Sequence, residues 1–536
     1  MIKAKQITLE NVKNAYENFA LSKYYNATLF FIICVCYLFS KEDIGFLILM
    51  IVIISNCILV DDIMPMILPL VGMCIIVLRL YDGWEKLFDL WPLAICGAIA
   101  LVFHFVYYRK KFKKSKLLLP LLAVSVALLA GGLFVISVKE YFSFNAIYYT
   151  IGLGPGMIGF YLLFRHYLNP QKKYNTFEAI ADIANTIGGI VIAMLVIQYV
   201  QNVIPKINAI PVWEPQQIWT DRIIGGPLQF GNNLSTVLLM VTPFSFYKAK
   251  ETKWKNYVYT TLGSVECLAM IFTMSRSGIV FGMLFIIFYA IYLFNDSKLR
   301  KKFKSSLAFA LPIVIMLIVI MSDRRFWQFL FTLAFNSQAF PQDKLLLLLL
   351  GVVISGIGLY VYLDVVDRNP AKRKTILMIS EITFIVGVAI LVLFWKYLFD
   401  ILLPLGGTRV EMADVAIKNL FKYPLFGTGM GYTGMQEIYN PHGLMLNAYH
   451  CIIFQIIGSM GMVGMFAYGY FFHKKYEMLF KIENGKFFYF ILPIIGLHAM
   501  SLINPGVMMP LSYAMFEILI LAVAENYLDE KAAKCI

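Results

Sequence analysis

Apolar segments of about twenty residues follow one another along nearly the whole chain, and this feature limits most strongly how the chain can fold. The hydrocarbon core of a bilayer is about 30 Å thick and takes about 20 helical residues. Measured against that length, the sequence predicts an all-α, polytopic integral membrane protein with about sixteen transmembrane helices. The predicted spans are residues 25–40, 44–60, 63–80, 88–107, 117–137, 145–164, 176–200, 232–247, 257–274, 277–294, 305–322, 345–366, 375–403, 447–472, 487–503 and 509–525.

The composition excludes a soluble chain. Of the 536 residues, 60% are hydrophobic and 15% are charged, whereas soluble domains have about 25% charged residues. A soluble chain of this length would form about three or four domains and would need far more polar residues to cover them. Cytosolic enzymes and free nucleic-acid-binding proteins are therefore excluded. The eight cysteines have no paired spacing in a loop and predict neither a disulfide framework nor a zinc site.

Basic residues alternate regularly between the predicted spans. If the N-terminus is cytoplasmic, every second connection lies inside and is expected to carry Lys and Arg. All of these connections are basic except the tight turn at Asp61 and Asp62. The inside connections are residues 109–116, 165–173, 248–255, 298–304, 368–374 and 474–486, together with both tails. The net charge of +14 thus reflects orientation in the membrane, with both termini cytoplasmic, and predicts no nucleic-acid partner.

The chain is predicted to have three parts, which are distinguished by the long polar connections on the outer side of the membrane. Residues 1–200 are predicted to form N-terminal transmembrane helices. Residues 201–472 form a membrane core with two long outer connections, 201–231 and 403–446. Residues 473–536 form C-terminal transmembrane helices and a cytoplasmic tail. Chemistry is expected in the outer connections, because polar residues are concentrated there on one side only.

The connection over residues 403–446 contains a helix start signal. Thr408 and Glu411 match the S/T-x-x-E capping box, and apolar residues then recur at helical spacing until Pro424 stops the helix. A short amphipathic helix at the outer interface is predicted, with Arg409 in its first turn. A cation there opposes the helix dipole unless an anion is present. Arg409 is therefore either a phosphate clamp or an arginine that reaches the headgroups.

Two more arginines lie on the predicted outer side. Arg276 stands between two spans with almost no polar buffer, and its planar guanidinium fits a phosphate in a bidentate manner. It also fits a kinked helix end from which the side chain reaches the headgroups. Arg222 has Asp221 beside it, so a surface ion pair competes with a role in anion binding.

His442 and His450 are the two outer histidines. His450 stands at the outer mouth of the fourteenth predicted span, where a neutral imidazole can accept a proton from a sugar hydroxyl. A satisfied interface histidine is the alternative interpretation. Arginines that hold a diphosphate and a histidine that activates an acceptor together indicate a glycosyl-transfer site. The outer connections contain no cysteine nucleophile, nucleotide-binding glycine loop or metal-ligand spacing.

Several short motifs follow one another along the chain between residues 220 and 465. They are Thr-x-Ser-Arg at 273–276, Gly-x-Arg at 407–409, Pro-Leu-Phe-Gly-x-Gly at 424–429, and His450 with Gln455, Gly461 and Gly464. These motifs resemble those of the O-antigen ligase and O-antigen polymerase family of bacterial membrane glycosyltransferases. Asn232 and Asn233 stand where that family often has Asn-Pro-Asn. Cys451 replaces the Asn that usually follows the family's histidine, which leaves His442, in Pro441-His442-Gly443, as the alternative base.

The resemblance implies an enzyme of the bacterial inner membrane that acts at the outer face without a metal or another cofactor. By this resemblance His450 is the base, and Arg276 and Arg409 bind the diphosphate of an undecaprenyl-diphosphate-linked glycan. The partners implied are this donor, a glycan or glycolipid acceptor, and membrane lipids. A polymerase uses a second lipid-linked repeat as acceptor, whereas a ligase uses a different glycolipid or cell-wall anchor. We expect a polysaccharide polymerase, with the ligase as the alternative.

A transporter of lipid-linked oligosaccharide is the alternative from another class. It would place ionisable residues deep in the helix bundle and would show an internal repeat. Glu266, Glu381 and Lys396 are ionisable residues of that kind. The two halves of the sequence show no repeat, and the polar connections lie on one side.

Overall fold

A computed structural model describes most of the chain, and the helices below all lie within its described part. The described residues are 9–77, 91–111, 113–137, 144–203, 231–250, 254–273, 275–295, 303–322, 342–396, 408–430, 449–483, 485–503, 508 and 511–534. These residues form helices and turns, without a strand. The protein is therefore all-helical over this part of the chain.

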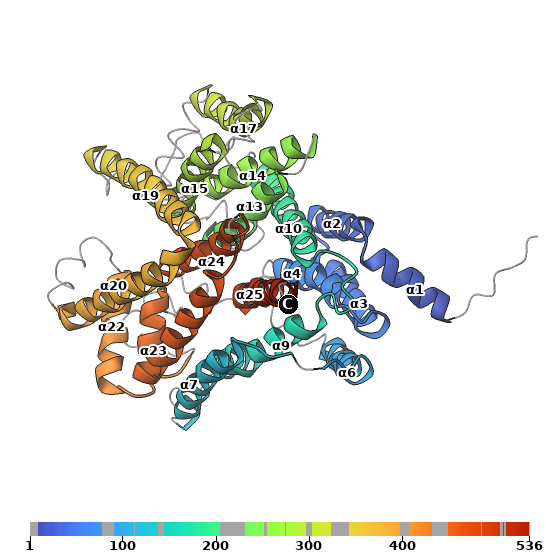
Figure 1. The fold of residues 1–536 in the computed structure, drawn as a ribbon, viewed down its shortest axis with the longest axis horizontal. Coiled ribbons are helices and arrows are strands. Elements are labelled where there is room, and N and C mark those ends of the chain that lie inside the picture. Colours follow the sequence, from blue (N-terminus) through green and yellow to red (C-terminus); the bar gives the residue numbers. More distant parts are fainter. Residues whose placement is uncertain are drawn as a thin grey trace, which may run out of the picture. The chain divides into compact units, whose positions relative to one another are not determined.

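Each predicted apolar segment falls on a helix (Figure 1). In chain order the elements are α1 Leu9–Ala20, α2 Lys23–Leu38, α3 Glu42–Leu59, α4 Met64–Val77, α6 Trp91–Tyr107, α7 Leu118–Ser137, α8 Phe144–Ile151, η2 Gly152–Gly156, α9 Met157–Tyr167, α10 Thr176–Gln198, η3 Tyr199–Val203, α13 Gly231–Lys248, α14 Trp254–Phe272, α15 Arg276–Asn295, α17 Phe303–Ser322, α19 Gln342–Arg368, η4 Pro370–Lys372, α20 Arg373–Leu393, α22 Thr408–Lys422, α23 Ile452–Leu479, α24 Phe487–Ser501 and α25 Leu511–Lys534.

Several of these helices are long and apolar enough to cross a bilayer. By length and composition, seven helices within the described residues qualify, or eight if the bent pair Glu10–Ala20 and Lys23–Leu38 is one span. Shorter apolar helices, such as Met64–Ile75 and Ile95–Tyr107, accompany them. The chain is thus a helical membrane protein. The larger number of about sixteen spans stays a prediction.

The chain forms two compact units that interleave along the sequence. The first consists of Met1–Phe112 and His166–Val361, and the second of Lys113–Arg165 and Tyr362–Ile536. In the first unit α10 packs against α2, α4, α13 and α14, and α14 also packs against α15 and α17. In the second unit α23 packs against α7, α22, α24 and α25. The three-part division of the sequence stays a prediction about organisation along the chain.

The acidic turn that broke the charge alternation is neutralised within the first unit. Asp61 accepts hydrogen bonds from Lys110 Nζ (3.0 Å) and Gln171 Nε2 (2.9 Å). Asp62 is buried and accepts a hydrogen bond from the hydroxyl of Tyr174. The partners of both carboxylates come from connections predicted to be cytoplasmic. The turn therefore belongs with those basic connections, although its own sequence is acidic.

Asp62 gives the first unit a pH-dependent stability. Burial raises the pKa of its carboxyl group to about 6, although Tyr174 and the backbone N–H groups of Met64 and Asn169 donate hydrogen bonds to it. In the unfolded chain an Asp titrates at about pH 4. Between these two values the folded protein holds a proton that the unfolded chain has lost, so the free energy of unfolding falls as the pH rises through this interval.

We expect Asp62→Asn to remove this pH dependence, which amounts to about 2 kcal/mol between about pH 4 and pH 6. Unfolding of purified wild type and variant, followed across this range, measures it. Asp61→Asn is the matched control. Burial alone would raise the pKa of Asp61, but the hydrogen bonds from Lys110 and Gln171 lower it overall, so its contribution is lost as the pH falls. Equal slopes in wild type and Asp62→Asn would contradict the assignment.

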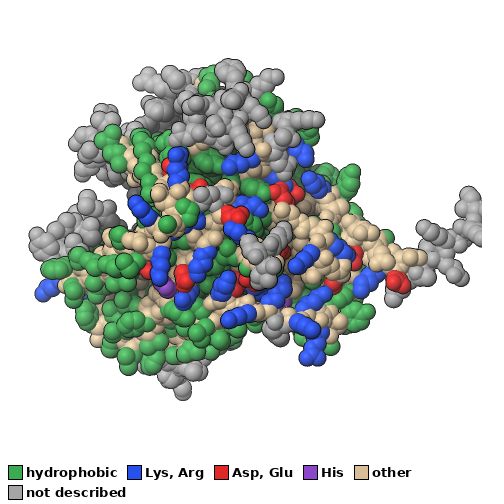
Figure 2. Space-filling model, viewed as in Figure 1, with side chains coloured by type: hydrophobic (Ala, Val, Ile, Leu, Met, Phe, Trp, Pro, Cys, Tyr) green, Lys and Arg blue, Asp and Glu red, His purple; other side chains and the backbone are tan. Residues whose placement is uncertain are grey.

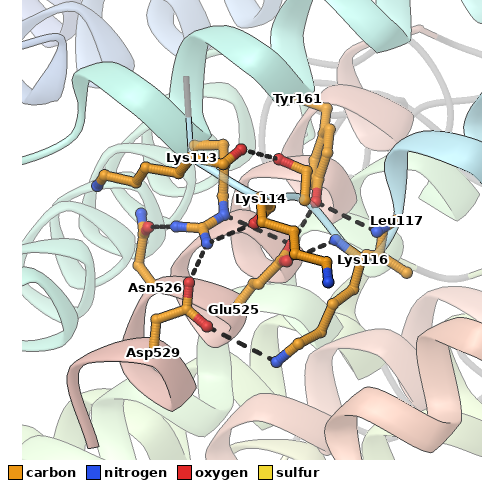
Figure 3. Close-up of polar contacts among 10 residues, drawn as sticks. Lys113, Lys114, Lys116, Leu117, Tyr161, Glu525, Asn526 and Asp529 are labelled. Atoms are coloured by element: carbon orange, nitrogen blue, oxygen red, sulfur yellow. Dashed lines mark hydrogen bonds and ion pairs between the residues drawn. The ribbon is translucent and has the colours of Figure 1, made fainter. Parts of the chain in front are cut away.

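A buried ion cluster joins three segments of the second unit that are all predicted to be cytoplasmic (Figure 3). The fully buried Arg165 forms an ion pair with Asp529, donates to Asn526 Oδ1 and lies 3.6 Å from Glu525. The backbone N–H of Lys116 donates to Glu525 Oε1 over 2.7 Å. Lys116, Arg165 and the end of α25 therefore lie together, as their predicted common side of the membrane requires.

Charged and hydrophobic side chains occupy different parts of the surface of the second unit. Charged side chains of both signs lie at the surface around the C-terminal end of α25, among them the pairs Lys116–Asp529 and Lys531–Glu483 (Figure 2). Hydrophobic side chains cover the sides of α20, and of its most apolar 18 consecutive residues within Pro370–Leu393 only 6% are buried inside the protein. An apolar helix with so little protein contact is what a lipid environment accommodates.

Candidate functional site

His450 lies immediately before α23, in a conformation that most residues avoid. Its φ is +51°, in the left-handed region, and its side chain is partly buried. Cys451 then adopts an extended conformation as the N-cap, and α23 begins at Ile452. Histidine tolerates this backbone region better than most side chains, but a residue stays there only when its surroundings hold it.

Gln455 is the residue that holds this segment. Its side-chain oxygen Oε1 accepts the backbone N–H of Tyr449 over 3.0 Å, and its Nε2 donates to Ser459 Oγ over 2.7 Å. The Gln455 side chain is fully buried, so its amide group has little freedom to choose other partners. Gln455 thus fixes the backbone directly before His450.

The Tyr449 side chain anchors the same segment to α22. Its ring packs with Met412, Val415 and Ala416 of α22, and its hydroxyl accepts a hydrogen bond from Asn419 Nδ2 over 2.8 Å. His450 is therefore placed between a buried anchor, Tyr449, and the start of α23.

Helix α22 begins at Thr408, within one residue of the predicted start. Its predicted apolar face is confirmed: Ala413, Ile417 and Leu420 are buried, and the first two pack with Trp395. This face packs against protein rather than lipid. Arg409 is the second residue of α22, and its side chain lies outside the described residues.

The turn over residues 424–429 is hydrogen-bonded directly to a kink in α23. Gly461 has a φ of +57° and interrupts the helix. The two segments are joined by four backbone hydrogen bonds: Met462 N–H to Pro424 O (2.8 Å), Val463 N–H to Leu425 O (3.1 Å), Thr428 N–H to Gly458 O (2.9 Å) and Gly429 N–H to Ser459 O (2.9 Å). The kink exposes backbone groups that a regular helix would use internally, and the turn satisfies them.

Glycine is required where these two segments meet. A Cβ on Gly461 would lie 2.6 Å from the carbonyl oxygen of Pro424, and a Cβ on Gly427 would lie 2.5 Å from that of Gly458. Gly427 also has a positive φ of 65°. Both glycines belong to motifs that are visible in the sequence, but no pattern in the sequence indicates that the two motifs bond to one another.

The turn that carries Arg276 belongs to the first unit. Ser275 caps α15: its Oγ accepts the backbone N–H of Gly278 over 2.8 Å, and Arg276 is the first helical residue. The Ser277 hydroxyl donates to Asn232 Oδ1 over 2.6 Å. The structure has two helices here, α14 and α15, with a capped break between them, rather than one long kinked helix.

The start of α13 packs tightly against this turn. Ser235 Oγ lies 3.0 Å from Thr273 Oγ1, and a Cβ on Gly231 would lie 2.6 Å from Thr273 O. The segment with Asn232 and Asn233, which stands where the family often has Asn-Pro-Asn, therefore contacts the Thr-x-Ser-Arg turn. Asn232 provides a side-chain contact to the turn.

The predicted site residues are thus described to different extents. His450 is described in full, and Arg276 and Arg409 lie at the first and second positions of their helices. The side chains of both arginines, and the whole of His442 and Arg222, lie outside the described residues. Arg276 belongs to the first unit and Arg409 and His450 to the second, so a site shared by all three stays a prediction.

Sequence reasoning did not single out Tyr449 or Asn419 as supports of His450. The only available signal was an aromatic residue directly before a histidine, which is weak. Among the described residues, no group of three or more His, Cys, Asp or Glu is placed to hold a metal ion. Comparison of the chain with protein-family models, curated proteins and solved structures finds no match.

Proposed function

We propose that the protein is an integral membrane glycosyltransferase that moves a glycan from a polyprenyl diphosphate carrier to an acceptor hydroxyl. The carrier is taken to be undecaprenyl diphosphate, and the reaction to occur at the outer face of a bacterial inner membrane. In this proposal about sixteen spans place both termini in the cytoplasm, and α22 lies near the outer interface. The acceptor is a second lipid-linked glycan, which makes the enzyme a polysaccharide polymerase.

One observation carries this proposal: His450 is held in a left-handed conformation at the start of α23. The buried amide of Gln455 and the packing of the buried Tyr449 ring both hold the residue directly before His450. Backbone strain of this kind costs about 1–2 kcal/mol and persists at positions where the surroundings impose one geometry. A general base benefits from such fixed placement, because proton transfer requires a heavy-atom separation of about 3 Å.

The positions of Arg276 and Arg409 support binding of a diphosphate. Each arginine lies in the first turn of a helix, where unpaired backbone N–H groups and the helix dipole favour an anion. A cation in that position is unfavourable without an anion. Two arginines at two helix N-termini would supply charge and N–H donors to the two phosphates of the leaving group.

The proposed chemistry is a single displacement at the anomeric carbon of the donor. A ring nitrogen of neutral His450 accepts the proton of the acceptor hydroxyl as its oxygen bonds to the anomeric carbon. The bond from that carbon to the diphosphate oxygen breaks, and the electron pair leaves with the polyprenyl diphosphate. The arginines stabilise the charge that develops on that leaving group. The histidinium then returns its proton to solvent or to the diphosphate.

The reaction can be tested with the purified protein in liposomes that contain a lipid-linked oligosaccharide as the sole sugar source. A ladder of longer products, with release of polyprenyl diphosphate, is expected for a polymerase. If a ladder is absent and a single product forms only after a different glycolipid acceptor is added, the enzyme is a ligase. Absence of any product with either acceptor would contradict glycosyl transfer.

We expect Arg276→Lys and Arg409→Lys each to weaken donor use by at least about tenfold. Lysine keeps the charge but lacks the planar fork that binds a phosphate through two parallel hydrogen bonds. The kcat/KM for the lipid-linked donor in the liposome assay measures the effect. Arg368→Lys, at an exposed i,i+4 ion pair with Asp364, is the control and should leave transfer unchanged. Wild-type donor use in both variants would rule out these arginines as the diphosphate site.

A further inference from the structure

Glu266 of α14 is fully buried in the first unit, and neither of its carboxyl oxygens has a hydrogen-bond partner among the described residues. Its Oε1 lies against α10 at Gly188, where an added Cβ would come within 2.0 Å of it. An isolated carboxylate is too unstable to persist in a protein interior or a bilayer. The group must therefore carry a proton or bind a cation.

Two polar neighbours of Glu266 on α13 can donate a hydrogen bond to its carboxyl group only by giving up the acceptors that they have in the structure. They are the hydroxyl groups of Ser245 and Thr242. Ser245 Oγ donates its proton to Asn185 Oδ1 over 2.6 Å, and Thr242 Oγ1 donates to Leu238 O over 2.6 Å. Each hydroxyl has a single proton, so only its lone pairs remain for the carboxyl group while these bonds are kept. Oxygen atoms without free protons are the ligands that a proton or a hard cation binds.

A second polar group beside this position is also unpartnered. The amide nitrogen Nδ2 of Asn185 is buried without a hydrogen bond in the described structure. Asn185 lies one helical turn before Gly188 on α10. Buried polar groups on both α10 and α14 therefore lie without a hydrogen-bond partner among the described residues.

Polar side chains connect Glu266 to one end of the helix pair. The spacing of three or four residues places them on facing sides of α10 and α13. They are Glu178, Asp182 and Asn185 on α10, and Thr242, Ser245 and Lys248 on α13. At the end of this row Lys248 Nζ pairs with Glu178 Oε2 (2.5 Å) and Asp182 Oδ1 (3.1 Å). The Glu178 and Asp182 side chains are 33% and 21% exposed, so the row runs from a partly solvated ion cluster into the buried carboxyl group.

We propose that Glu266 is a reversible binding site for a monovalent cation, either a proton or Na⁺, reached from the Lys248 end of α10 and α13. This site is independent of the proposed glycosyl transfer, which requires no cation. It gives the α10, α13 and α14 helices of the first unit a buried group whose charge changes with cation binding, as in membrane proteins coupled to an ion gradient.

The other titratable groups around Glu266 are either buried and neutral or already paired. Cys267 of its own helix and Tyr289 of α15 are buried and neutral. The charged groups are those at the end of the row on α10 and α13, namely Glu178, Asp182 and Lys248, which are already paired. The described side chains of α17 include none that titrates. A change of charge at this position can therefore be assigned to Glu266.

Infrared spectroscopy of the purified full-length protein in lipid nanodiscs tests the proposal directly. The difference between wild type and Glu266→Gln isolates the carbonyl band of a protonated Glu266. We expect this band at acidic and neutral pH and its loss at alkaline pH. Glu517→Gln is the matched control, because Glu517 is equally buried but pairs with Lys475 over 2.6 Å. That difference spectrum should lack a protonated band at neutral pH.

Sodium distinguishes the two forms of the proposal. If Na⁺ removes the band at constant pH, whereas K⁺ does not, Glu266 binds Na⁺. If only pH removes it, the site binds a proton. Labelling of wild type with a hydrophobic carbodiimide, which reacts with protonated carboxyl groups, provides a second readout that needs no variant; mass spectrometry then quantifies Glu266. A band and a labelling yield that stay constant across pH and Na⁺ would overturn the proposal. So would the absence of both signals at every pH.

Discussion

His450→Ala is expected to lower glycosyl transfer by at least about a hundredfold, while the protein still folds and inserts. General-base catalysis contributes about 10²- to 10⁴-fold to a rate, and alanine removes the only group at this position that accepts a proton. The liposome assay with the lipid-linked donor measures the loss. Because the base acts on the acceptor, the binding of donor should change little.

A glycine substitution separates the role of the His450 side chain from that of its backbone. His450 has a φ of +51°, which costs energy for residues with a Cβ but not for glycine. His450→Gly should therefore be at least as stable as wild type and still inactive. A variant that is more stable but inactive cannot owe its inactivity to misfolding. Full activity in either variant would end the role of His450 and leave His442 as the base.

Gln455 provides a test of positioning at the same site. Gln455→Leu removes the acceptor of the Tyr449 N–H and the hydrogen bond to Ser459, but it leaves the His450 side chain in place. We expect a smaller loss of kcat than in His450→Ala, of about tenfold or more, because the base stays present but less well oriented. The apparent pKa of the pH–rate profile should shift with the loss. Gln455→Glu, which keeps the acceptor oxygen, should recover part of the activity.

The sequence predicted the helices well because their signal is local. Runs of about 20 apolar residues mark helices whatever their neighbours are, and all the predicted segments fall on helices. The same locality limits what the pattern can decide: the shorter helices α4 and α6 do not reach the length of a span within the described residues. The acidic turn at Asp61 showed the limit of counting charges, because its compensating Lys110 lies far along the chain.

The candidate site was predicted only in part, because its geometry depends on contacts between distant segments. The sequence placed His450 before a helix and Arg409 at the start of another, both of which depend on local patterns. It could not show that Gln455 turns back to the Tyr449 backbone or that the turn over residues 424–429 bonds to a kink at Gly461. Neither contact leaves a period or a charge pattern that a single sequence displays.

The glycine pair that joins this turn to α23 gives the largest stability prediction. Gly427→Ala and Gly461→Ala are each expected to lower the free energy of unfolding by about 2–5 kcal/mol. About 1–2 kcal/mol comes from a Cβ in the left-handed region, and about 1–3 kcal/mol from forcing atoms into an already packed site. The clashing atoms are backbone atoms, at 2.5 Å from Gly427 Cβ and 2.6 Å from Gly461 Cβ. Backbone cannot rotate away as a side chain can.

Gly469→Ala is the matched control, since Gly469 lies on the same helix and an added Cβ would meet no atom within 4 Å. There alanine should be neutral or should stabilise α23 by up to about 1 kcal/mol, because it favours helix more than glycine does. Unfolding of the purified proteins in mixed micelles, followed by circular dichroism, compares the three variants. If Gly461→Ala unfolds like Gly469→Ala, the turn and the kink are not paired in the folded protein.

Loss of the pairing between the turn and α23 should also lower activity at the candidate site. The turn leads directly to Met430, whose Sδ lies 3.5 Å from Gln455 Nε2, and Ser459 contributes both a carbonyl to the turn and a hydroxyl to Gln455. An alanine at 427 or 461 that separates the turn from α23 therefore also loosens the amide that holds His450. We expect transfer to fall in both variants at temperatures where they remain folded, with Gly469→Ala unchanged. Reduced stability with wild-type activity would show that the kink supports the helix bundle but not the base.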